Sequence, residues 1–127
     1  MSEAVTQGVR VTVRSDFRAD RSLPAQGRYL FTYTVRVRNE GTAAAKLLSR
    51  HWIITDAGGE REEVVGDGVV GKQPHLEPGG SFEYTSFCVL KTPIGQMRGT
   101  YTMMRDDGTT FLAEIAPFTL AVPSALN

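Results

Sequence analysis

Cysteine, long apolar runs and helical periodicity are all scarce in this sequence of 127 residues. Cys88 is the one cysteine, so an intrachain disulfide and a cysteine-rich zinc site are both excluded. No stretch approaches the roughly 18 apolar residues of a transmembrane helix. Apolar residues nowhere recur with the spacing of an amphipathic helix, which favours β structure.

An excess of charge of one sign is also absent, because 14 basic residues balance 14 acidic ones. This balance argues against a protein that mainly holds nucleic acid or an anionic membrane surface. The first residues, MSEAVTQGVRV, lack the basic start and apolar run of a secretion signal, and we expect a cytoplasmic location. The length predicts a single domain over residues 1–127.

Alternation of apolar and polar residues runs through most of the chain. It is clearest over residues 29–37, and similar runs cover residues 9–17, 47–54, 62–65, 82–90, 97–104 and 110–122. Short turn sequences such as EPGG and RDDG separate these runs. About seven strands and no clear helix predict an all-β fold, an antiparallel β-sandwich of the immunoglobulin or fibronectin type III kind. A closed barrel is the main alternative.

The hexapeptide GDGVVG, residues 66–71, has the G-x-G-x-x-G spacing of dinucleotide-binding loops. Such a loop needs a helix after its last glycine, because the helix N-terminus helps to bind the pyrophosphate. Pro74 and Pro78 follow too closely for that helix, since proline disrupts a helix interior. The simplest interpretation is an irregular connection or β-bulge between strands.

A second interpretation of this hexapeptide does not need a helix. Successive backbone N–H groups in a glycine-rich loop can form a concave anion site, and a neighbouring lysine adds positive charge. Gly66, Gly68, Gly71 and Lys72 are therefore candidates for contact with a phosphate-bearing small molecule.

The residues that could carry catalysis form no recognisable set. His51 and His75 do not have the spacing of zinc ligands. Cys88 lies in an apolar run, as expected of a small core residue. In a strand, Glu62 and Glu63 would point to opposite sides and could not act on one bond. We therefore expect no enzyme activity, no metal site and no cofactor.

Arginines recur at alternate positions in the first two long runs. If these runs pair as strands, Arg10, Arg14, Arg36 and Arg38 share one face. Such a basic stripe is either a solvated face that discourages aggregation or a surface for an acidic partner or a phosphate-bearing ligand.

One long run, GDGVVGKQPHLEPGGSFEYTSFCVLKTPIGQMRGTYTM (residues 66–103), resembles the signature of the ApaG family. The preceding residues 49–60, SRHWIITDAGGE, fit the pattern of the same family. This resemblance implies a fibronectin-III-like sandwich in a small bacterial protein, encoded near a diadenosine tetraphosphate hydrolase. It also implies an association with cobalt resistance and magnesium efflux, for which the sequence offers no ligand set, so we expect an indirect link.

Two functions are compatible with these observations. The first is a non-catalytic binding module with a protein partner, because sandwiches offer faces, edges and loops for recognition. The alternative is a nucleotide or pyrophosphate binder, related to diadenosine tetraphosphate, that uses the glycine-rich loop.

Overall fold

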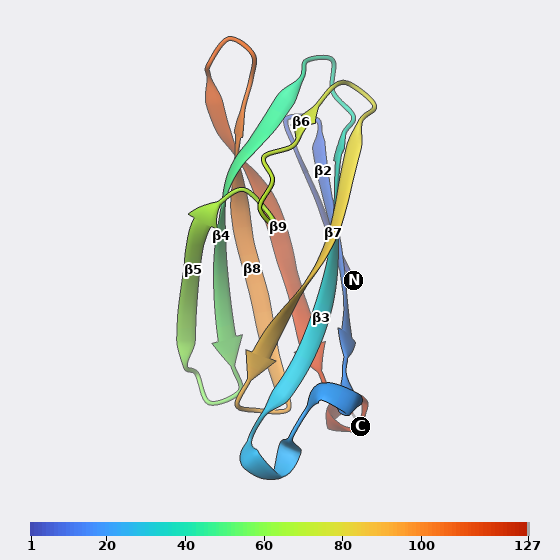
Figure 1. Ribbon diagram of the computed structural model, residues 1–127, viewed down its shortest axis with the longest axis vertical. Coiled ribbons are helices and arrows are strands. Elements are labelled where there is room, and N and C mark those ends of the chain that lie inside the picture. Colours follow the sequence, from blue (N-terminus) through green and yellow to red (C-terminus); the bar gives the residue numbers. More distant parts are fainter. Residues whose placement is uncertain (127) are drawn as a thin grey trace.

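The computed structural model describes residues 1–126 as two packed antiparallel sheets with nine strands (Figure 1). The first sheet has the order β1 (Ser2–Thr6), β2 (Val9–Phe17), β3 (Tyr29–Asn39) and β7 (Ser81–Leu90). The second has the order β5 (Arg61–Asp67), β4 (Ala45–Asp56), β8 (Ile94–Met104) and β9 (Thr110–Ala121), with β6 (His75–Leu76) also paired to β4. Short 3₁₀ turns span Ala19–Arg21, Pro24–Gln26 and Pro123–Leu126.

The predicted antiparallel sandwich is confirmed, with β1 and β6 in addition to the seven expected strands. In β1 the apolar residues Ala4 and Val5 are adjacent, so the strand does not alternate clearly in sequence. The β1–β2 turn is built from Gln7 and Gly8, with φ of 47° and 83°. Positive φ at both central residues is typical of the tight type I′ hairpin turn. Among the helices of residues 1–126, none is long and apolar enough to cross a membrane.

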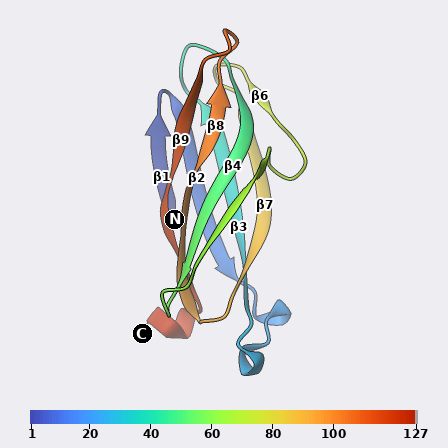
Figure 2. The ribbon, with the colours of Figure 1, turned by 90° about the vertical axis from the view of Figure 1, so that its left-hand side faces the viewer.

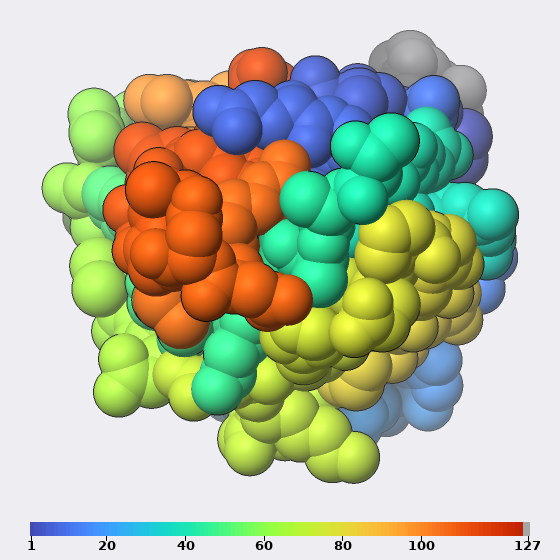
Figure 3. Space-filling view, turned by 90° about the horizontal axis from the view of Figure 1, so that it is seen from above, coloured from blue at the N-terminus to red at the C-terminus, as the bar shows by residue number. Residues whose placement is uncertain are grey.

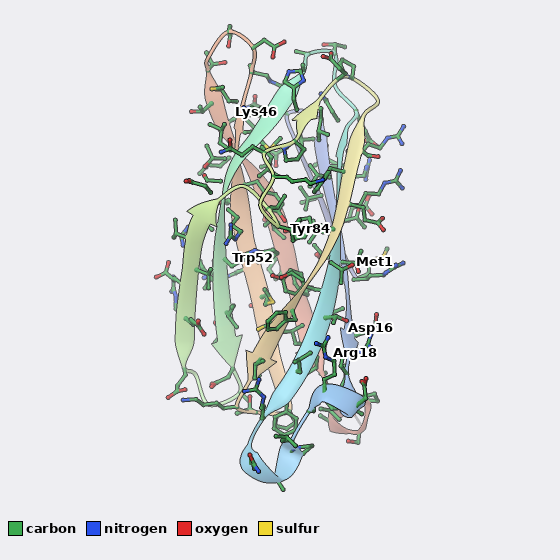
Figure 4. All side chains as sticks on the ribbon, in the orientation of Figure 1. Met1, Asp16, Arg18, Lys46, Trp52 and Tyr84 are labelled. Carbon is green, nitrogen blue, oxygen red and sulfur yellow. The ribbon has the colours of Figure 1, made fainter. Side chains whose placement is uncertain are left out.

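Trp52 of β4 is the centre of an aromatic cluster between the sheets (Figure 4). Its ring lies 5.3 Å from that of Tyr33, 6.0 Å from Phe118 and 6.3 Å from Tyr101, between ring centroids, in edge-on arrangements. Edge-on contacts between large buried rings add stability beyond the burial of their area. The cluster therefore connects β3 of one sheet with β4, β8 and β9 of the other.

A β-bulge near the start of β4 changes which residues face the core. The register against β8 shifts between Leu47 and Ser49, so Leu48 is the extra residue. Leu47 and Trp52 are consequently both buried, although in a regular strand residues five apart would point to opposite faces. After the bulge, Arg50 has the same parity as Trp52, which directs its side chain to the inner side of the sheet.

The two long sides of the sandwich differ. On one side β9 packs beside β1 and β2 (Figure 2), where the Thr6 hydroxyl oxygen accepts from the Glu114 N–H at 3.1 Å. The Ser15 hydroxyl donates to the Thr119 carbonyl there, also at 3.1 Å. On the other side β7 and β5 are the last strands of their sheets, and no strand pairing joins them within residues 1–126. This second side is therefore open.

The end of the sandwich that carries β6 is closed by turns (Figure 3). Asn39 is fully buried there, and its amide nitrogen donates to the carbonyls of Ala43 and Leu76 at 2.8 and 3.0 Å. Arg105, from the β8–β9 hairpin, donates to the carbonyls of Ala43 and Gln7. These contacts hold the segment that leads into β4, and β4 carries the residues that face the open side.

Tyr84 and Tyr101 provide a test of the contact between the sheets, because their buried hydroxyls hydrogen-bond to each other. We expect Tyr84→Phe to lower the free energy of unfolding by about 1 to 3 kcal/mol, since the Tyr101 hydroxyl loses its partner. The double variant with Tyr101→Phe should be less destabilised than the sum of the two single variants. Denaturant unfolding measures all three, and additive effects would contradict the pairing.

Candidate functional site

The glycine loop, residues 66–72, leaves β5 and makes a tight reversal. Gly68 has φ of 59°, and Val70 and Gly71 have φ of 44° and 78°. Val69 and Lys72 exchange two backbone hydrogen bonds, of 2.8 and 2.9 Å, around Val70 and Gly71. Positive φ at both central residues indicates a type I′ turn, and it is costly for the β-branched Val70. The segment is thus a strand-to-strand connection, as its simplest interpretation predicted.

Two of the three glycines lie against close contacts, Gly68 against backbone and Gly66 against a side chain. A β-carbon at Gly68 would lie 2.2 Å from the carbonyl oxygen of Lys72. A β-carbon at Gly66 would lie 2.8 Å from the guanidinium carbon of Arg50. Gly71, at the tip, has open space where a β-carbon would be, so its positive φ is the reason for glycine there.

The N–H groups of the glycine loop are largely engaged with the protein. The Gly68 N–H donates to the Leu48 carbonyl at 2.7 Å, beside the bulge of β4. The N–H groups of Val69 and Lys72 donate to each other's carbonyls. An anion at this loop would depend on the N–H groups of Val70 and Gly71 and on the Lys72 side chain. Anion binding by Gly66, Gly68, Gly71 and Lys72 stays a prediction.

The glycine loop continues the edge of the second sheet between β5 and β6. The Gln73 amide donates to the Leu48 carbonyl at 2.9 Å, and the Leu47 N–H donates to the Pro74 carbonyl at 3.0 Å. The Val69 side chain is fully buried in the core. The loop is therefore attached to β4 along its length.

Arg50 connects this loop to the space between the sheets. Its Nη1 donates to the carbonyl oxygens of Asp67 at 2.9 Å and Gly68 at 3.0 Å. Arg50 was not among the candidate residues predicted from the sequence. The sequence did contain one indication. Arg50 is two residues before Trp52 and four before Ile54, so in a strand its side chain lies on the same side as these apolar residues.

Beside Arg50 the open side of the sandwich contains a hollow of about 360 Å³, which we name the edge groove. Its floor and one wall come from inward-facing side chains of both sheets, and its other wall comes from β7. The lining residues are Tyr33, Arg50, Trp52, Ile54, Glu62, Val64, Ser86, Phe87, Cys88, Val89 and Met97. Four consecutive residues of β7, Ser86 to Val89, line the groove. Because successive side chains of a strand point to opposite faces, the edge of β7 and not one of its faces forms the second wall.

The polar groups inside the edge groove are neutral apart from those at its ends. Burial raises the pKa of the Cys88 thiol to about 11, with a further contribution from the negative charge of Glu62. Burial likewise raises the pKa of Tyr33, while its hydrogen bond with Ser86 opposes that shift. At neutral pH the thiol and phenol are therefore protonated, and the charges belong to Arg50 and Glu62.

The other candidate residues lie away from the groove. Glu62 and Glu63 point to opposite sides of β5, as expected, because Glu62 lines the groove and Glu63 contacts the His51 ring at 2.8 Å outside it. The His75 ring lies 2.9 Å from Asp106 near the closed end. Within residues 1–126, no three His, Cys, Asp or Glu side chains gather as they would around a metal ion.

The four arginines of the predicted stripe do share the outer face of the first sheet, because β2 pairs with β3. Carboxylates lie among them, however. Arg10 contacts both Glu3 and Glu40, and Arg38 lies 3.8 Å from Glu40. The Arg10 guanidinium also lowers the pKa of Glu40. This mixture of charges is typical of a solvated face.

The contacts of Gly68 predict a larger effect there than at Gly71. We expect Gly71→Ala to lower the free energy of unfolding by about 1 to 2 kcal/mol, since it meets positive φ in open space. Gly68→Ala should cost about 3 kcal/mol or more, because a clash with the Lys72 carbonyl is added. Denaturant unfolding compares the pair, and equal losses would contradict the described path of the loop.

Comparison with known proteins identifies the family. The family model for the ApaG domain matches residues 19–105. Protein ApaG of Anaeromyxobacter dehalogenans (strain 2CP-C) is 72% identical over 127 residues, which cover 100% of both chains. Protein ApaG of Stenotrophomonas maltophilia (strain K279a) is 50% identical over the same full lengths.

A solved structure agrees with these relatives. The crystal structure of the ApaA protein from Bordetella pertussis superimposes with a TM-score of 0.89 at 50% identity. The match covers 91% of this chain and 94% of that one. Sequence and fold lead to the same conclusion: the chain belongs to the ApaG domain family.

Proposed function

We propose that this chain is a non-catalytic binding module whose edge groove holds an extended segment of a cytoplasmic partner protein. The observation that carries the proposal is a hollow of mixed polar and apolar lining that runs along the free edge of β7. Trp52 and Met97 provide an apolar floor for a guest side chain, and Val64 lines the opposite wall.

The edge of β7 is suited to pair with an incoming strand. An unpaired edge presents backbone N–H and C=O groups, which peptide-binding domains use to add a guest strand to a sheet. Proteins usually protect such edges with charges or proline. Residues 85–90 of β7, TSFCVL, contain neither, and Phe87 is 61% exposed. This unprotected segment supports a role in pairing with a partner.

The chemistry of the groove supports binding over catalysis. A nucleophilic cysteine needs a lowered pKa, whereas burial raises that of Cys88 to about 11.

Under this proposal, the link to cobalt and magnesium that the family resemblance implies is indirect and passes through the partner. Nucleotide or pyrophosphate binding at the glycine loop is the alternative, and titration with ATP and pyrophosphate separates the two.

Peptides selected from a random display library provide the test. We expect selected peptides to shift the NMR amide signals of residues 86–90 and of β5, while ATP and pyrophosphate leave residues 66–72 unshifted. Selected peptides that shift only the outer faces, or no enrichment at all, would contradict the proposal.

Phe87 and Leu112 offer a matched pair of variants for the same assay, since they are 61% and 59% exposed and lie on different sheets. Phe87→Lys places a charge on the proposed docking edge and should weaken the selected peptides about 5-fold or more. Leu112→Lys adds the same charge on β9 and should leave their affinity unchanged. Equal effects of the two variants would place the peptides elsewhere.

A further inference from the structure

We propose, resting on the function proposed above, that the edge groove selects its guest by the order of charges. The preferred guest strand carries a basic, an apolar and an acidic residue at positions i, i+2 and i+4, in that order along its chain. It pairs antiparallel with β7. The following contacts of the groove carry each part of this pattern.

The acidic position of the guest is set by Arg50. The hydrogen bonds that its guanidinium makes within residues 1–126 both come from Nη1 and hold the loop carbonyls. Nε and Nη2 are left to donate to a guest carboxylate. An arginine whose head is already fixed is a favourable partner for a carboxylate, because little further side-chain freedom is lost on binding.

The basic position of the guest is set by Glu62. This carboxylate lines the groove and acts on the buried Cys88 thiol through its charge. Among the described residues it takes part in no ion pair, whereas its neighbour Glu63 contacts His51 and Arg61. Beyond Glu62 lies a second hollow, whose carboxylates Asp56 and Glu60 are accompanied by Arg61 and Lys91. Because Lys91 lies 3.7 Å from Glu60, Glu62 is the carboxylate at this end that is left for a guest cation.

The spacing follows from the register of β4 with β5. Arg50 pairs with Gly66, Trp52 with Val64 and Ile54 with Glu62. The two charged ends are therefore four residues apart along β5, or about 13 Å at the rise of an extended strand. A guest strand of the same rise covers this distance in four residues, and its alternate side chains face one side. Its middle side chain then lies over the pair Trp52 and Val64.

The direction follows from β7. Val89 lines both the groove and the second hollow beside Asp56 and Glu60, so β7 runs from the Arg50 end towards the Glu62 end. Antiparallel pairing is slightly more stable per residue than parallel pairing. The guest therefore begins at Glu62 with its basic residue and ends at Arg50 with its acidic residue.

Two peptides of identical composition test this order: TKTLTDT and TDTLTKT, both acetylated and amidated. We expect the first to bind the wild-type protein about 3- to 10-fold more tightly, a range set by two partly exposed ion pairs. Affinity and position are read from NMR amide shifts at peptide concentrations up to several millimolar. Equal affinity, or a preference for TDTLTKT, would overturn the inference.

The adjacent residues Glu62 and Glu63 supply the matched variants. The Glu62→Lys variant should lose the preference for TKTLTDT over TDTLTKT. It should also bind the peptide TETLTDT more tightly than TKTLTDT, because the charge at position 62 is reversed. Glu63→Lys, on the outer side of β5, should keep the wild-type preference. Gain of the acidic peptide separates a role in charge recognition from a structural role. Equal behaviour of the two variants would overturn the inference.

Comparison of the designed peptides with the library-selected peptides separates failure of the charge order from failure of the proposed function. If neither designed peptide binds while library-selected peptides still shift residues 86–90, the charge order is wrong and the docking site stands. If the selected peptides also leave β7 unshifted, the proposed function itself fails.

Discussion

The two hydrogen bonds from Arg50 to the carbonyls of Asp67 and Gly68 are the constraint on which the open side of the sandwich depends. They place the guanidinium directly over Gly66, so a side chain at 66 would displace it. They also direct the carbonyl groups of Asp67 and Gly68, and not N–H groups, towards the Arg50 guanidinium. A segment with the spacing of a phosphate cradle is thereby attached to Arg50, a residue that lines one end of the edge groove.

One long side of the sandwich is closed by contacts between the sheets, and the other, which contains the edge groove, is open. Where β9 packs beside β1 and β2, side-chain hydrogen bonds close the sandwich. Where β5 faces β7, the hollow lies against the inner residues Trp52 and Met97, which are 2% and 1% exposed. A guest strand between β5 and β7 would cover this apolar floor and pair with residues 85–90 of β7, which carry no charge.

Much of the fold could be predicted from the sequence, whereas the groove could not. Period-two alternation predicted seven strands, because a sheet with one buried face requires it. The bulge at Leu48 could not be predicted, since it depends on the register with β8. Alternation places Arg50 on the same side as Trp52 and Ile54, but its contacts with the glycine loop could not be predicted. The glycines of 66–71 were found, but the contacts of Gly66 with Arg50 and of Gly68 with Lys72 are encoded by no local pattern.

Hydrogen exchange of individual amides tests most directly whether the glycine loop is a fixed connection and not an open cradle. The account predicts slow exchange for the N–H groups of Gly68 and Val69, which donate to carbonyls at 2.7 and 2.8 Å. The N–H of Gly71, at the tip of the same turn, should exchange rapidly. Exchange of Gly68 as fast as that of Gly71 would contradict the account.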